Sequence, residues 1–112
     1  MTRISLAGNQ LSGSIPTELL LGGGKRTVDL SNNKLSGQIP TMIGQAWPGL
    51  QSLRLEKNEF SGTLPTSIGQ MTELSTLVLS DNSFLSGSIP SEIGLMQLLS
   101  EFGELPKGLL LH

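Results

Sequence analysis

Apolar residues recur along the chain in short pairs whose members lie two positions apart. The pairs are Ile4/Leu6, Val28/Leu30, Leu53/Leu55 and Leu77/Leu79. An apolar side chain at every second position is typical of a strand with one buried face, so each pair predicts a short strand. An asparagine stands three residues after each pair, at Asn9, Asn33, Asn58 and Asn82. The pattern therefore predicts four copies of one strand-and-turn unit.

A second phrase follows each asparagine: a Ser-Gly dipeptide and then Ile-Pro or Leu-Pro. The prolines are Pro16, Pro40, Pro65 and Pro90, which step by 24, 25 and 25 residues. The fourth copy carries one extra residue before its Ser-Gly. Beyond each proline the apolar spacing changes from two to three, as in Ile68, Met71 and Leu74. A spacing of three favours a tight, 3₁₀-like segment.

Read together, these positions give LxxLxLxxNxLSGxIPxxIGxL over about 24 residues per copy. They resemble the plant-type leucine-rich repeat, found in the ectodomains of receptor-like kinases and receptor-like proteins. The resemblance covers roughly residues 3 to 102. It implies an α/β-type solenoid: a right-handed coil of about four repeats, with a short parallel sheet on the concave face and 3₁₀ or irregular convex segments.

We place one domain at residues 1–102 and divide it into the repeats 3–26, 27–51, 52–75 and 76–102, with approximate boundaries. An irregular C-terminal tail is expected over 103–112, because Pro106 cannot donate a hydrogen bond to a fifth strand. Within each repeat, we expect the asparagine amide to satisfy backbone groups that the turn leaves unpaired. Ser-Gly and proline then supply the bends.

Three stretches depart from the repeat. The glycines of residues 21–26 predict a loose convex loop, since glycine is entropically expensive to order. Trp47 accompanies a one-residue insertion, and we expect it to be a partly buried plug over that insertion. The terminal residues Leu109 to Leu111 have no counterpart in the repeat, and we expect them to be frayed.

Composition removes several classes of function. The formal net charge is −2, and only 14% of residues are charged, without a run of like charges. Nucleic-acid binding needs clustered Lys and Arg, so no nucleic-acid partner is expected. The longest strictly apolar run, Leu19 to Leu21, is far shorter than the ~20 residues that cross a bilayer, so we expect no membrane insertion by this segment itself. The chain has no cysteine for a disulfide or a thiolate site.

Catalytic chemistry is not expected. The one histidine, His112, is the last residue, where nothing rigid positions it against a nucleophile. Glu56 and Glu59 flank the predicted exit of a strand, and a carboxylate pair for hydrolysis needs one member in an apolar pocket. We therefore predict no enzyme activity, no cofactor and no metal.

The outward positions between the strand leucines are the candidate binding surface. The candidates are Asp29, Ser31, Arg54, Glu56, Val78 and Ser80. These positions vary between copies while the scaffold positions repeat, which suits recognition of one specific partner. Arg54 and Asp29 are the expected anchors. The alternative, that these side chains only keep the surface soluble, stays open.

By resemblance, the chain is a recognition module for a protein, peptide or glycan ligand, extracellular or at the cell surface within a membrane-attached parent. The family's terminal caps usually carry paired cysteines, so we expect a fragment of a longer array or a truncated product. The alternative function is an ice- or surface-binding solenoid. Its motivation is a regular column of hydroxyl residues after the prolines, at Thr17, Thr41, Thr66 and Ser91.

Overall fold

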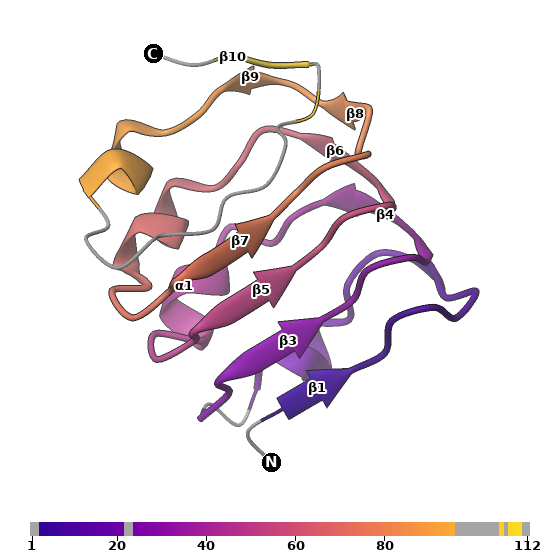
Figure 1. Cartoon of the computed structure of the whole chain (residues 1–112), viewed down its shortest axis with the longest axis horizontal. Coiled ribbons are helices and arrows are strands. Elements are labelled where there is room, and N and C mark those ends of the chain that lie inside the picture. Colours follow the sequence, from indigo (N-terminus) through magenta and orange to yellow (C-terminus); the bar gives the residue numbers. More distant parts are fainter. Residues whose placement is uncertain (1–2, 22–23, 96–105, 107, 111–112) are drawn as a thin grey trace.

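The computed structural model describes residues 3–21, 24–95, 106 and 108–110. Successive coils stack side by side from the N-terminus to the C-terminus (Figure 1). One strand per coil forms a parallel sheet in the order β1 (Arg3–Ser5), β3 (Thr27–Asp29), β5 (Ser52–Arg54) and β7 (Thr76–Val78). Its register aligns the four predicted apolar positions Ile4, Val28, Leu53 and Leu77. The predicted parallel strands are confirmed.

A second parallel sheet runs along the stack, and the sequence pattern did not predict it. Its strands are β2 (Ser12–Gly13), β4 (Lys34–Gln38), β6 (Glu59–Gly62) and β8 (Phe84–Leu85). The Ser-Gly dipeptides, expected only to bend the chain, lie in or next to these strands. Their glycines do bend it: φ is +81° at Gly13, +80° at Gly37 and +79° at Gly62. Other residues are strained at such angles, so the strands turn where glycine stands.

The C-terminal tail adds a further strand pair to the structure. Strand β10 (Leu109–Leu110) pairs in parallel with β9 (Gly87–Ser88), and Leu109 is buried. We expected these leucines to be frayed, and for Leu109 and Leu110 this expectation is wrong. They add their backbone groups to β9, and Leu109 joins the apolar core. The glycines 22–23 of the expected loose loop, and residues 96–105, lie outside the described residues.

The convex side carries one short helical segment per coil. Three of the segments are 3₁₀ helices, as predicted: η1 (Thr17–Leu20), η2 (Thr66–Gln70) and η3 (Ser91–Leu95). The second coil instead forms an α-helical turn, α1 (Ile43–Ala46), which ends where the N–H of Trp47 donates to the carbonyl of Ile43 at 3.1 Å. The inserted residue supplies the extra length of this turn.

Trp47 is more deeply buried than expected. We predicted a partly buried plug, whereas its side chain is 0% exposed and belongs to the main core cluster. Its indole Nε1 has no hydrogen-bond partner among the described residues. The α-helical turn therefore brings the ring into the core instead of leaving it over the surface.

Neighbouring convex segments approach closely where a glycine permits it. A Cβ built on Gly44 would lie 1.7 Å from the carbonyl oxygen of Ser67. The Ser67 hydroxyl also links the two segments. It donates to the carbonyl of Thr41 at 2.7 Å and accepts the N–H of Gly44 at 3.0 Å. The first coil has Leu20 at the equivalent position, four residues after its proline. A groove lined partly by Leu20 and Met42 lies there.

Most of the strand leucines fill the core that the coils share. Leu30, Leu55 and Leu79 are completely or almost completely buried. Leu6, the equivalent residue of the first coil, is 36% exposed, so our expectation that it would be buried is wrong. Among the described residues its coil has a neighbour on one side only. Leu6 accordingly lines an open apolar cavity of about 240 Å³ together with Leu11, Leu19 and Leu30.

Candidate functional site

An asparagine ladder fixes the exit of each strand. The amide nitrogen of Asn58 donates to the carbonyls of Leu55 and Glu56 in its own coil at 3.2 and 3.3 Å, and to Leu30 of the preceding coil at 2.9 Å. Its Oδ1 accepts the N–H of Leu35 at 3.0 Å. Asn33 and Asn82 repeat this pattern. The predicted role of the asparagines is confirmed, and it holds the outward residues just before them in place.

The backbone ladder continues past the strands along the same face. The N–H of Asn32 donates to the carbonyl of Glu56 at 3.0 Å, and that of Lys57 donates to Ser80 at 2.9 Å. At this point the backbone turns through positive φ, with 56° at Asn32, 59° at Lys57 and 59° at Asp81. Two columns of outward side chains therefore precede the turn. The columns are Ser5, Asp29, Arg54, Val78 and, two residues later, Ala7, Ser31, Glu56, Ser80.

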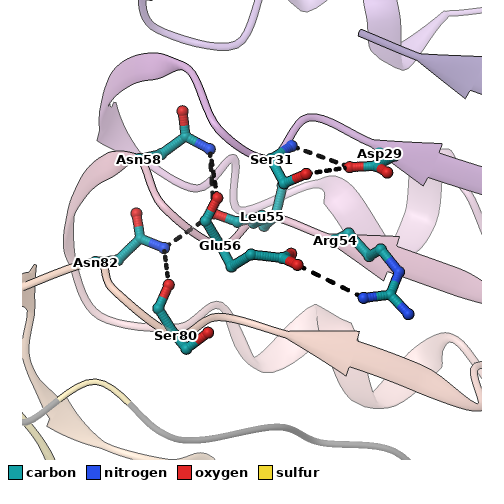
Figure 2. A network of polar contacts seen from close by, with 8 residues as sticks. All are labelled: Asp29, Ser31, Arg54, Leu55, Glu56, Asn58, Ser80 and Asn82. Atoms are coloured by element: carbon teal, nitrogen blue, oxygen red, sulfur yellow. Dashed lines mark hydrogen bonds and ion pairs between the residues drawn. The ribbon is translucent and has the colours of Figure 1, made fainter. Parts of the chain in front are cut away.

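The six predicted site residues all lie in these two columns, and four of them interact in pairs (Figure 2). Ser31 donates both its N–H, at 3.1 Å, and its hydroxyl, at 2.6 Å, to Oδ1 of Asp29. Arg54 and Glu56 form an ion pair with 3.5 Å between Nη1 and Oε2. Asp29 and Arg54 are register partners on adjacent strands. We expected single anchors, whereas the structure brings the polar residues of two coils into one cluster.

The candidates differ in how accessible they are. Ser31 and Val78 are only 4% and 7% exposed, although the strand pattern places both on the outward face. The side chain of Arg54 is 36% exposed and that of Glu56 is 18% exposed. Asp29 and Ser80 are partly exposed. A ligand on this face can therefore reach Asp29, Arg54, Glu56 and Ser80. Ser31 is buried and holds the Asp29 carboxylate in place by its two hydrogen bonds.

Other chemistry is sparse in the described part of the chain. It contains no group of three or more His, Cys, Asp or Glu side chains that could hold a metal ion. None of its helices has the length and the apolar character that crossing a bilayer requires. Arg26, directly before β3, and Glu73, three residues before β7, form an exposed ion pair at 3.7 Å.

Comparison with protein-family models finds the leucine-rich repeat, matched at residues 1–20, 26–46, 49–71 and 73–96. No curated protein matches the chain. Among solved structures, a chain of the BIR3–SERK2 complex from Arabidopsis thaliana is 40% identical with a TM-score of 0.85, over 96% of this chain and 56% of that one. The BIR2 ectodomain from Arabidopsis thaliana is 36% identical with a TM-score of 0.85, over 96% and 54%.

The plant peptide hormone receptor RGFR1, solved in complex with RGF2, is 34% identical with a TM-score of 0.82. The match covers 98% of this chain and 20% of that one. The chain thus spans a little over half of the BIR structures and a fifth of the peptide receptor. Four matched repeats and these structural similarities agree with the stacked coils and the asparagine ladder. The chain belongs to the leucine-rich repeat family.

Proposed function

We propose that this chain is a non-enzymatic recognition module whose concave face binds a peptide or protein ligand. The observation that carries the proposal is the contrast between the two kinds of position in each coil. Scaffold leucines and asparagines repeat, while the outward column next to them changes from Ser5 to Asp29 to Arg54 to Val78. A face that varies on a fixed scaffold suits one specific partner.

The structural relatives support a peptide or protein ligand. RGFR1 is described as a peptide hormone receptor in complex with RGF2, and BIR3 is in complex with SERK2. The receptor kinase HAESA, 35% identical over 87% of this chain, is in complex with a peptide hormone. By analogy, we place the chain outside the cell or at its surface, in a membrane-attached receptor-like protein. The comparisons give no support to ice binding.

The size of the face supports a working unit longer than this chain. Four strands about 4.8 Å apart span only ~15 Å, and three strand residues add ~10 Å in the other direction. A patch of a few hundred Å² is well below the ~800 Å² that each partner buries in a standard interface. The relatives at 54% and 56% coverage are correspondingly longer. We therefore propose that the chain contributes one segment of a longer concave surface.

A selection experiment tests the location of the site. Peptides are selected from a displayed random library on the 112-residue chain, and amide hydrogen exchange is measured with and without a selected peptide. Slower exchange in β3, β5 and the residues that follow them is the expected result. Slower exchange confined to α1 and η2 would place the binding surface on the convex side and refute the proposal.

A further inference from the structure

The polar cluster Asp29–Ser31–Arg54–Glu56 has an uneven supply of donors and acceptors. Oδ1 of Asp29 accepts two hydrogen bonds from Ser31. Oε2 of Glu56 contacts Arg54 at 3.5 Å, which is long for a charge-assisted hydrogen bond. Oε1 of Glu56 is buried and has no hydrogen-bond partner among the described residues. The cluster therefore contains a carboxylate that is only partly satisfied (Figure 2).

A carboxylate with an unpaired oxygen favours a ligand that carries a hydrogen-bond donor. Leaving a buried acceptor unsatisfied costs about 1–3 kcal/mol, and more for a charged group. Oε1 itself is closed to solvent, so a ligand N–H approaches through the exposed part of the side chain and supplies a donor that the cluster lacks. The side chain of Glu56 is 18% exposed, so a ligand on the concave face can approach its carboxylate. The Arg54 guanidinium lies on the same face at 36% side-chain exposure, so a ligand donor competes with it for the Glu56 carboxylate.

The charges of the cluster favour a cation over an anion. Asp29 and Glu56 contribute two carboxylates against the one guanidinium of Arg54, which leaves an excess of one negative charge. An incoming carboxylate would have to displace Glu56 from Arg54 and would then face both acidic groups. In the next column Lys57 and Asp81 are exposed and of opposite sign, and Arg3 lies at the start of β1, in register with Thr27 and not with Asp29. These three charged residues leave the net charge of the cluster negative.

We propose that this cluster is a subsite for a cationic, N–H-donating side chain of the ligand, the guanidinium of arginine or the ammonium of lysine, with the Glu56 carboxylate as its principal acceptor. The inference rests on the proposed function, because it assigns the chemistry of one position on the same concave face. Asp29, held by Ser31, supplies the second negative charge. Val78, the register partner of Arg54 on the next strand, is almost completely buried.

Small probes test the inference without the natural ligand. The ¹⁵N-labelled 112-residue chain is titrated with N-acetyl-arginine amide and, separately, with N-acetyl-glutamate amide, and amide chemical shifts are followed by NMR. The arginine probe should shift the amides of Ser31, Glu56 and Ser80 saturably, and the glutamate probe should not.

Matched variants assign the effect to Glu56. Glu56→Gln keeps the shape of the side chain and removes its charge, so the dissociation constant of the arginine probe should rise about tenfold or more. Asp29→Asn retains an acceptor for Ser31 and should weaken binding less. Glu18→Gln, an exposed carboxylate of η1, is the control and should change nothing. The Trp47 emission spectrum and the melting temperature verify that each variant is folded.

Each other outcome overturns a defined part of the account. Unchanged affinity in Glu56→Gln, or an absence of saturable shifts with the arginine probe, refutes the cationic subsite. Saturable shifts of the same amides by the glutamate probe would make Arg54 the centre of an anion site, so that the concave recognition surface survives and the ligand class fails. Shifts by either probe confined to α1 and η2 would count against both the subsite and the proposed function.

Discussion

The amide oxygen of Asn82 accepts the N–H of Phe60, 22 residues earlier in the chain, at 3.1 Å. The nitrogen of the same amide donates to the carbonyls of Leu55 and Leu79 at 2.9 and 3.0 Å. One buried side chain thus links the strand exits of two coils. In Asn9 the amide nitrogen donates to carbonyls of its own coil only, at Leu6 and Ala7.

This difference predicts unequal costs for the same substitution. Asn58→Ala removes a buried amide and leaves the N–H of Leu35 without its acceptor, while the carbonyls of Leu30 and Leu55 keep the amides of Asn33 and Asn82. One unpaired buried group costs about 1–3 kcal/mol, and we expect a loss of that size in the free energy of unfolding. Asn9→Ala should cost less than about 1 kcal/mol. Urea unfolding followed by Trp47 emission measures both, and equal costs would contradict a ladder that couples coils.

Leucine truncations make a parallel prediction for the core. Leu55 is completely buried in the middle of the stack, and Leu55→Ala should cost about 2–5 kcal/mol. Leu6 lies in the first coil and is 36% exposed, so Leu6→Ala empties a site that solvent already reaches and should cost clearly less. Urea midpoints at unchanged m-values give the comparison. A larger loss for Leu6→Ala would refute the one-dimensional stacking of the coils.

Close packing on the convex side predicts a severe effect of one methyl group. In Gly44→Ala the new Cβ would lie 1.7 Å from the Ser67 carbonyl oxygen, which belongs to the backbone and cannot move freely. We expect a loss of about 3 kcal/mol or more. Gly49→Ala is the matched control, because its Cβ would meet the end of the flexible Arg26 side chain at 3.1 Å. If thermal unfolding shows both variants equally stable, the packing described for Gly44 is wrong.

Burial of Trp47 makes it a natural probe of folding. The chain has one tryptophan and no tyrosine, so its near-ultraviolet fluorescence reports on this side chain. The emission should be blue-shifted in the folded chain and move to longer wavelength in urea. Trp47→Ala should cost about 3–5 kcal/mol. Trp47→Phe should cost less, because it also removes the unpartnered Nε1. Circular dichroism follows both variants, and a water-like emission maximum in the native state would contradict the burial.

The sequence predicted the features that depend on a repeated local pattern. The strand pairs, the asparagine ladder and the 3₁₀ segments each recur at a fixed spacing, and each was found, the 3₁₀ segments in three of the four coils. The second sheet was not predicted, because the Ser-Gly dipeptides that contain Gly13, Gly37 and Gly62 are typical of turns. These glycines do have positive φ, yet they lie within strands. The burial of Trp47 and the pairing of Leu109 depend on single insertions and on the chain's own terminus, for which no other copy provides a template.

The sequence predicted where the candidate residues lie on the sheet, but not the contacts between them. Alternation along the strands placed Asp29 and Arg54 on the concave face, and they are register partners there. The bonds from Ser31 to Asp29, and the pair between Arg54 and Glu56, depend on side-chain conformations that spacing does not determine. Alanine substitution at outward strand positions usually changes stability by less than ~0.5 kcal/mol. Asp29→Ala, however, would remove the acceptor of the buried Ser31 and could lower stability. Asp29→Asn and Arg54→Gln are therefore the better variants for testing binding separately from stability.

The most direct measurement of the central claim compares the affinity of one library-selected peptide for two sets of variants. The concave set is Asp29→Asn, Arg54→Gln and Glu56→Gln, and the control set is Glu18→Gln, Glu73→Gln and Glu92→Gln. Calorimetric titration should show the dissociation constant rising about tenfold or more in the concave set and staying within about twofold in the control set. Melting temperatures should show the variants still folded at the temperature of titration. Loss of binding in the control set, with full affinity in the concave set, would contradict the claim that the concave face is the recognition surface.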